Sequence, residues 1–159
     1  MIEQFVQFVL QEFCLKCQGC CRFREAESLW APSLLDNDNI PPLAISSNKR
    51  IRLVPNLRQN NFLCTFLNLK DNKCKIYFFR PFECQLYPFL INRNAGKAFL
   101  AVDLKCPFVK QRLETKEFKE YTKNLSGILN SPSLIKILKN NPQIIQAYPE
   151  ALNLRELNF

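Results

Sequence analysis

The stretch CLKCQGCCRF, residues 14–23, places four cysteines within eight positions. Its C-x-x-C spacing occurs twice in succession, and each such turn brings two sulfurs to one side, at the separation that a tetrahedral metal site requires. The remaining cysteines are widely spaced along the chain. We therefore treat the whole set as candidate metal ligands, with the metal tying distant segments together: Cys14, Cys17, Cys20, Cys21, Cys64, Cys74, Cys84 and Cys106.

The composition limits the chemistry that can accompany these thiols. The chain has 159 residues, of which 47% are hydrophobic and 14 are phenylalanine, so it can form an apolar core without disulfides. It contains no histidine, which excludes Ser-His-Asp and Cys-His catalysis, a histidine-ligated haem and the two-histidine iron site. Glu83, Asp103 and Tyr77 are conceivable acids or substrate contacts, but they form no recognisable catalytic pattern. Whether the protein is an enzyme stays open.

The N-terminal stretch MIEQFVQFVLQEF lacks the basic segment of a secretory signal, and no run approaches the ~20 apolar residues of a membrane span. We therefore expect a cytoplasmic protein with no membrane partner. In the reducing cytosol, clustered cysteines are metal ligands more often than disulfides. Four disulfides are the alternative for an even count. They suit small secreted domains that lack a core, and a Cys20–Cys21 bridge would be strained.

The first half of the chain combines a helix, a loop and short strands. Apolar spacing predicts an amphipathic helix over residues 2–13, which leads into Cys14. Residues 24–50 are polar and contain prolines, so we expect a loop there with one short helix near residues 33–39. Three segments are typical of short strands, with the turn LKDNK joining the last two: residues 51–54, 62–67 and 73–77.

The second half begins with FFRPFECQLYPF, residues 78–89, where Pro81 suits the start of a short helix that Pro88 ends. The turn Asn94-Ala95-Gly96 then predicts a β-hairpin, and residues 109–159 are expected to be helical. The whole is predicted to be α+β: a small metal-stapled domain with an N-terminal helix, short strands and hairpins, and a helical C-terminal segment. We assign residues 1–108 to a cysteine-cluster metal-binding domain and residues 109–159 to a helical extension that packs on it within the same domain.

The identity of the metal stays open between an iron–sulfur cluster and zinc. The run C-x-x-C-x-x-C, completed by a remote Cys-Pro such as Cys106-Pro107, is the spacing of a four-iron (4Fe–4S) cluster, which we favour slightly; soft thiolates also select zinc. Because neighbouring side chains point apart in extended backbone, we expect Cys20 and Cys21 to serve two sites, or two metals of one cluster. Our predicted partition is Cys14, Cys17, Cys20 and Cys106 against Cys21, Cys64, Cys74 and Cys84.

Two stretches resemble a known family. CLKCQGCC, residues 14–21, resembles the leading motif of the CxxCxxCC cysteine-cluster family, a YkgJ-like zinc- or iron-chelating domain. FLCTFLNLKDNKCKIYFFRPFECQLYPF, residues 62–89, is similar to its second block, with a cysteine in an apolar strand, a second before Ile-Tyr, then Arg-Pro, a third cysteine and Tyr-Pro-Phe. Cys106-Pro107 resembles the late cysteine of the family. Gly19 lies one place later than expected, and Gln85 stands where arginine is common. The resemblance implies a metal-chelating cysteine cluster.

We therefore expect a metal-binding protein with a redox or metal-handling role, whose partners are a metal ion or cluster and a protein redox partner. The alternative is a zinc-stapled structural module that binds nucleic acid or a protein. Its support is a net charge of +8, a pI of about 9.2 and the basic run Lys49-Arg50-Ile51-Arg52, with Arg58 close by. Positive charge is spread along the chain and no recognition motif occurs, so nucleic acid is the weaker expectation.

Overall fold

The computed structural model describes residues 6–159, which divide into two compact units. The first, here called the cysteine unit, is Leu10–Cys84. The second, here called the hairpin unit, combines the described residues up to Val9 with Gln85–Phe159. Seven of the eight cysteines lie in the cysteine unit, and Cys106 lies in the hairpin unit. The two units are described separately below.

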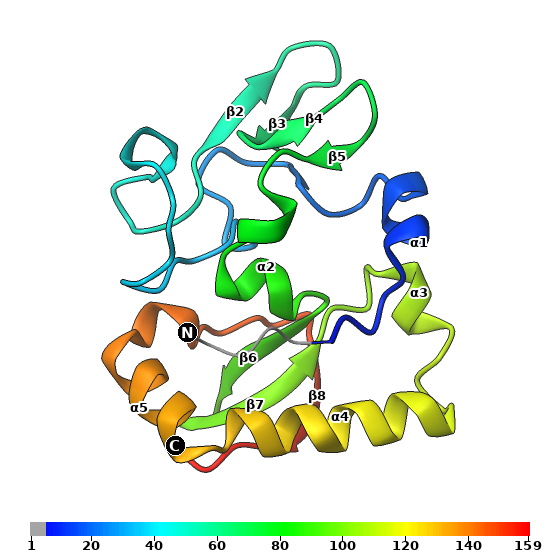
Figure 1. Cartoon of the computed structure of the whole chain (residues 1–159), viewed down its shortest axis with the longest axis vertical. Helices are drawn as coiled ribbons and strands as arrows, with labels where there is room; N and C mark the ends of the chain where they lie inside the picture. The colour runs from blue at the N-terminus through cyan, green and yellow to red at the C-terminus, as the bar shows by residue number, and fades with distance from the viewer. Residues whose placement is uncertain (1–5) are drawn as a thin grey trace. The chain divides into compact units, whose positions relative to one another are not determined.

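The cysteine unit is built from very short elements (Figure 1). One antiparallel sheet has the strand order β1-β3-β2, and a second sheet is the hairpin of β4 and β5. Its elements are α1 (Gln11–Lys16), β1 (Arg22–Phe23), η1 (Pro42–Ala44), β2 (Leu53–Asn56), β3 (Asn61–Cys64), β4 (Leu67–Asn68), β5 (Lys73–Cys74), η2 (Tyr77–Phe79) and α2 (Phe82–Leu86), whose last two residues belong to the hairpin unit.

The core of the cysteine unit includes thiols. Its buried members are Leu34, Ile40, Ala44, Ile51 and Cys64, and the partly buried Cys21 packs against them. Tight turns close both hairpins of this unit, with Asn60 at φ 48 between β2 and β3 and Asn72 at φ 57 between β4 and β5. Asparagine tolerates this left-handed backbone better than most residues. The short strands therefore bring cysteines into an apolar interior.

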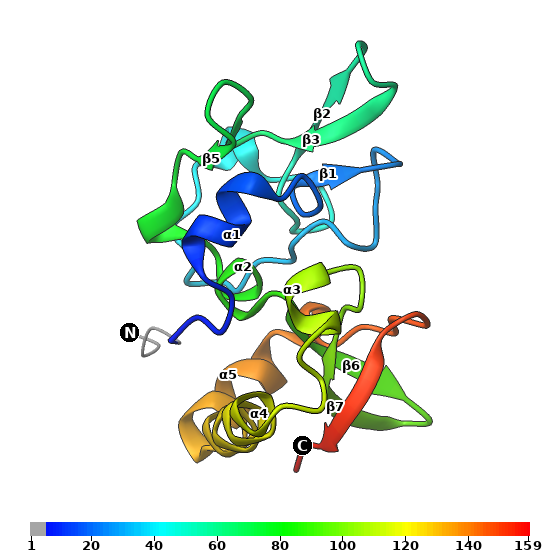
Figure 2. The same cartoon turned by 90° about the vertical axis from the view of Figure 1, so that its right-hand side faces the viewer.

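The hairpin unit is a three-stranded antiparallel sheet with helices (Figure 2). Its strand order is β6-β7-β8, and Figure 2 shows α4 and α5 on one side of this sheet. Within residues 6–159, no helix combines the length and the apolar character needed to cross a membrane. The elements are β6 (Phe89–Asn94), β7 (Lys97–Val102), α3 (Pro107–Lys110), α4 (Lys116–Leu129), α5 (Pro132–Asn140), η3 (Pro142–Ile144) and β8 (Leu152–Glu156).

Several expectations from the sequence are confirmed. The fold is α+β, with a helix near the N-terminus, short antiparallel strands and helices toward the C-terminus. The turn LKDNK joins β4 to β5, and α2 begins directly after Pro81 and ends before Pro88. The hairpin of β6 and β7 closes through Ala95 at φ 49 and Gly96 at φ 78. These positive φ angles match a two-residue turn of the mirror-image type that suits twisted hairpins.

Three local expectations are wrong. The helix predicted over residues 2–13 begins only at Gln11; residues 2–5 lie outside the described part, and residues 6–10 are not helical. No helix forms near residues 33–39, where Ser33 instead makes a β-bridge with Arg50. The segment expected to be helical throughout ends in a strand, β8, which pairs with β7. In each case contacts distant in sequence decide the local conformation.

Candidate metal centre

Each cysteine of the cysteine unit lies at the end of a short element, in a turn, or in a short helix. Cys14 lies in α1, and Cys17 is the residue that caps the C-terminus of this helix. The other five lie in the turn before β1, at the ends of β3 and β5, and in α2: Cys20, Cys21, Cys64, Cys74 and Cys84. All eight cysteines carry free thiols, so the four-disulfide arrangement is not the one that the structure has.

Cys21 connects these segments. Its thiol is hydrogen-bonded to the thiols of Cys20 and Cys64, and its carbonyl accepts a hydrogen bond from the Cys64 amide at 3.0 Å. Cys74 and Cys84 lie close enough to interact electrostatically with Cys21 and with each other. Thiols from four separate segments are thus gathered around one residue.

The backbone at Cys21 is not extended as the sequence argument assumed. Its φ is 66, in the left-handed region, and Cys20 and Cys21 lie together in a turn. Neighbouring side chains point apart in a strand, but in this turn the two thiols hydrogen-bond to each other. The expectation that they serve two sites, or two metals of one cluster, therefore loses its structural basis, although both remain candidate ligands.

The surroundings keep these thiols protonated. The hydrogen bond to Cys21 raises the pKa of the Cys20 thiol. The hydrogen bond from Cys20 lowers the pKa of Cys21, but the contact with Cys64, burial and the nearby Cys64 and Cys74 thiols outweigh it and raise this pKa to about 12. Burial raises the pKa of Cys74 and of Cys84, against the opposing effect of Arg80. A metal ion would have to displace these protons to bind.

Two carboxylates, Asp38 and Glu83, hold α2, the helix that carries Cys84. The sequence did not indicate this structural role. Asp38 accepts hydrogen bonds from the amides of Leu35 at 2.8 Å and Phe82 at 3.2 Å. Glu83 accepts one from the Ser33 amide at 2.5 Å. Glu83, considered above as a conceivable acid, thus joins α2 to the preceding loop. The sequence signal was faint: Asp and Glu occur near Pro-containing turns in many loops.

Cys106 is in the hairpin unit, where it is the residue preceding α3 and is only 8% exposed. Its amide donates to the Asp103 carbonyl at 3.2 Å. The carboxylate of Asp103 accepts from the Tyr87 hydroxyl at 3.0 Å and from the Lys105 amide at 2.9 Å. These contacts give Asp103 a role in fixing the turn before Cys106. The role of Cys106 as a metal ligand stays a prediction.

The thiol ligands are of the type that zinc and iron prefer, but their positions in the described part of the chain do not form a metal site. Within residues 6–159, no group of three or more Cys, Asp or Glu side chains is placed so that it could hold a metal ion as it stands. Thiolate sulfur is nevertheless the ligand that zinc and iron–sulfur clusters prefer, and these thiols already meet in pairs. Metal binding would require movements that bring further thiols to the ion.

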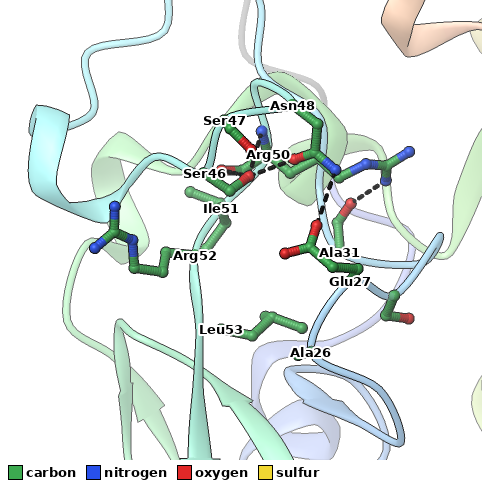
Figure 3. A pocket seen from close by; sticks show the side chains of 11 residues that line it. Ala26, Glu27, Ala31, Ser46, Ser47, Asn48, Arg50, Ile51, Arg52 and Leu53 are labelled. Atoms are coloured by element: carbon green, nitrogen blue, oxygen red, sulfur yellow. Dashed lines mark hydrogen bonds between the residues drawn. The ribbon is translucent and has the colours of Figure 1, made fainter.

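Residues 50–52 of the basic run line a separate polar pocket of about 340 Å³ (Figure 3). Lys49, just outside its lining, pairs with Asp36 at 2.8 Å. Arg50 donates to the carbonyls of Leu29 at 2.8 Å and Ala31 at 2.7 Å. Figure 3 shows Arg52 on the opposite side of the pocket, and its guanidinium donates to the Ile45 carbonyl at 3.2 Å. These cations are engaged within their own chain, and no cysteine lines the pocket.

Comparison with known proteins agrees with the cysteine pattern. Residues 13–107, more than half of the chain and all eight cysteines, match the model of the CxxCxxCC family, described as a "putative zinc- or iron-chelating domain". The protein belongs to this family.

The chain is also 28% identical over 102 residues to an uncharacterized protein of Methanocaldococcus jannaschii, MJ0661. That match covers 57% of this chain and 52% of the relative, so the chain spans about half the relative's length. No solved structure matches the chain. Metal binding is the property that the CxxCxxCC family supports.

Proposed function

We propose that the protein binds a metal through the thiolates of its cysteine unit and serves in redox chemistry or metal handling. The proposed ligands of one site are Cys21, Cys64, Cys74 and Cys84. The observation that carries this proposal is the position of Cys21, which hydrogen-bonds to Cys64 and interacts electrostatically with Cys74 and Cys84. Four thiolates are the number that closes a tetrahedral zinc site or holds an iron–sulfur cluster.

Charge supports the same ligand set. Burial raises the pKa of Cys74 and Cys84, the contact with Cys64 and burial raise that of Cys21, and repulsion between neighbouring thiolates adds to the cost in each case. When bound, a metal or cluster supplies the positive charge that makes thiolates stable there. The guanidinium of Arg80 lowers the pKa of Cys74 and Cys84 and would help to balance the remaining negative charge.

The redox or metal-handling role is supported by Cys20, the most exposed cysteine at the edge of the set. Cys20 is exposed and hydrogen-bonded to Cys21. A residue at this edge, beside the half-buried Cys21, is a point at which a thiolate of another protein could exchange for one of the ligands. With Cys14 and Cys17, Cys20 also forms the C-x-x-C-x-x-C run, which lies outside the four ligands named above; its spacing is the reason to propose an iron–sulfur cluster in preference to zinc. A protein redox partner and a cytoplasmic location belong to this proposal.

The second candidate is a zinc-stapled structural module. It is favoured by the length of the elements, since β1, β4 and β5 have two residues each and need further support to hold their positions. Such a module would present a surface to a protein or a nucleic acid. Phosphate contacts by the basic run have little support, because Lys49, Arg50 and Arg52 hydrogen-bond within the chain.

Visible absorption of anaerobically purified protein, combined with elemental analysis, tests the two candidates. A brown protein that contains iron and sulfide supports the cluster. Colourless protein with stoichiometric zinc would contradict the cluster and support the zinc-stapled structural module. The absence of both metals, before and after reconstitution, would contradict the proposed function itself.

A further inference from the structure

Asn72 contacts the cysteine-rich stretch through several hydrogen bonds, although no sequence motif singled it out. It lies in the turn between β4 and β5, two positions before Cys74, at φ 57. Its side-chain Nδ2 lies 2.8 Å from the carbonyl oxygen of Cys17, 2.9 Å from that of Leu15 and 3.4 Å from that of Cys14. All three acceptors belong to the last turn and the cap of α1.

These carbonyls need a donor. The last carbonyl groups of a helix have no partner within the helix and must be satisfied from outside. A primary amide carries two N–H groups, which match the two short distances to Leu15 and Cys17, while the longer one to Cys14 fits a shared hydrogen bond. Asn72 thus caps, from a turn 55 positions away in sequence, the helix end that carries the first two cysteines.

The other end of the Asn72 side chain is also engaged. Its Oδ1 accepts a hydrogen bond from the Arg22 guanidinium at 2.9 Å. Arg22 directly follows Cys21 and belongs to β1, where it pairs with Leu63, the neighbour of Cys64. One amide group therefore contacts the chain on both sides of the run Cys17 to Cys21, and its own turn leads into Cys74.

We infer that Asn72 is a positioning residue of the metal centre, which holds the loop of Cys17, Cys20 and Cys21 in register with the hairpin that carries Cys74. This inference rests on the proposed function. Residues of the shell that orients metal ligands typically change metal affinity by about 10- to 100-fold when they are mutated, and we take this range as the scale for Asn72. Asn72 touches no thiol in any hydrogen bond described here; it acts through the backbone of the ligand-bearing segments.

The test separates the side chain of Asn72 from its backbone conformation. Asn72→Gly removes the amide, while glycine accepts a positive φ without strain. Asn60→Gly is the matched control, because Asn60 is exposed, has φ 48 and lies in the neighbouring hairpin turn of the same unit. Affinity for Zn²⁺ is measured by competition with a chelator, and coordination by the visible bands of bound Co²⁺ at saturation.

We expect Asn72→Gly to weaken Zn²⁺ binding by about 10-fold or more and to shift the Co²⁺ bands. Asn60→Gly should leave both unchanged. A role for Asn72 in the turn alone predicts the opposite result, with Asn72→Gly matching the wild type in affinity and spectrum, and that result would overturn the inference.

A second variant covers the case in which Asn72→Gly does not fold. Asn72→Asp keeps the size of the side chain and the acceptor for Arg22, but its carboxylate faces the three carbonyls without a donor. It should lose Zn²⁺ affinity to a similar extent, and wild-type affinity in this variant would also overturn the inference. Failure of the wild type to bind either metal would instead contradict the proposed function, so the two failures are distinguishable.

Discussion

Cys21 is the residue on which the gathering of thiols depends. A side chain other than glycine costs about 1–2 kcal/mol in the left-handed backbone that Cys21 adopts at φ 66. Strain of this kind persists where the surroundings fix it and is common at functional sites. Here it turns the thiol toward Cys64 and, at the same time, keeps it beside Cys20. This local conformation is what a sequence argument based on extended backbone misses.

Replacement of Cys84 by serine tests the ligand set at this scale. Cys84→Ser removes a proposed thiolate, so metal content should fall and the metal-bound protein should unfold at least ~5 °C lower, because metal-binding energy is also folding energy. Elemental analysis and thermal unfolding by circular dichroism measure the two effects. Cys106→Ser, in the other unit, should leave the metal held by Cys21, Cys64, Cys74 and Cys84 in place. Unchanged metal content in Cys84→Ser would remove Cys84 from the set.

The elements differ in how far local sequence determines them. The β6–β7 hairpin and the short helix α2 depend on Asn-Ala-Gly and on flanking prolines, signals that act within a few residues. The strand β8 has no such signal, because Leu152–Glu156 becomes a strand only through pairing with β7. Phe8, expected on a helix, lies outside one and packs edge-to-face against Phe89, Phe108 and Phe118. Of the apolar residues in the predicted helix, Val9 is buried, whereas Val6 and Leu10 are exposed.

Replacement of alanine by glycine should have opposite effects on stability in the turn of the β6–β7 hairpin and in strand β7. Ala95 has φ 49, so Ala95→Gly should relieve strain and stabilise the protein by about 1 kcal/mol. Ala98 lies in β7 and is only 5% exposed, so Ala98→Gly should destabilise it by about 1–2 kcal/mol. Chemical denaturation of the two variants measures both. A loss of stability in Ala95→Gly would contradict the turn geometry.

At the scale of the whole molecule, the chain consists of two units with different means of support. The hairpin unit has a continuous apolar core, with Leu100, Ala101, Val102, Val109 and Leu129 fully buried. The cysteine unit has strands of two to four residues and a core that includes Cys64. The assignment of residues 1–108 to a metal-binding domain, with residues 109–159 packed on it within the same domain, stays a prediction. The candidate ligands follow from the spacing of the cysteines, whereas which of them lie near one another depends on contacts between segments far apart in sequence.

Removal of the metal should therefore affect the two units unequally. We expect a chelator to increase amide hydrogen exchange across residues 10–84, since their elements are too short to hold themselves. Amides of β6 and β7 should keep their protection, because their core contains no proposed ligand apart from Cys106. Hydrogen exchange followed by mass spectrometry compares the two regions in one sample. If both regions lost protection equally, or if neither lost any, the result would contradict the proposal that the metal supports the cysteine unit.

The central claim is that thiolates of the cysteine unit hold a metal, and the metal content of freshly purified protein tests it most directly. Elemental analysis under anaerobic conditions should find about one equivalent or more of zinc or iron per chain. The same analysis on a variant in which Cys21, Cys64, Cys74 and Cys84 are all serine should find that metal lost. Wild-type protein that holds no zinc or iron, even after incubation with either, would contradict the account, and so would full retention of metal by the serine variant.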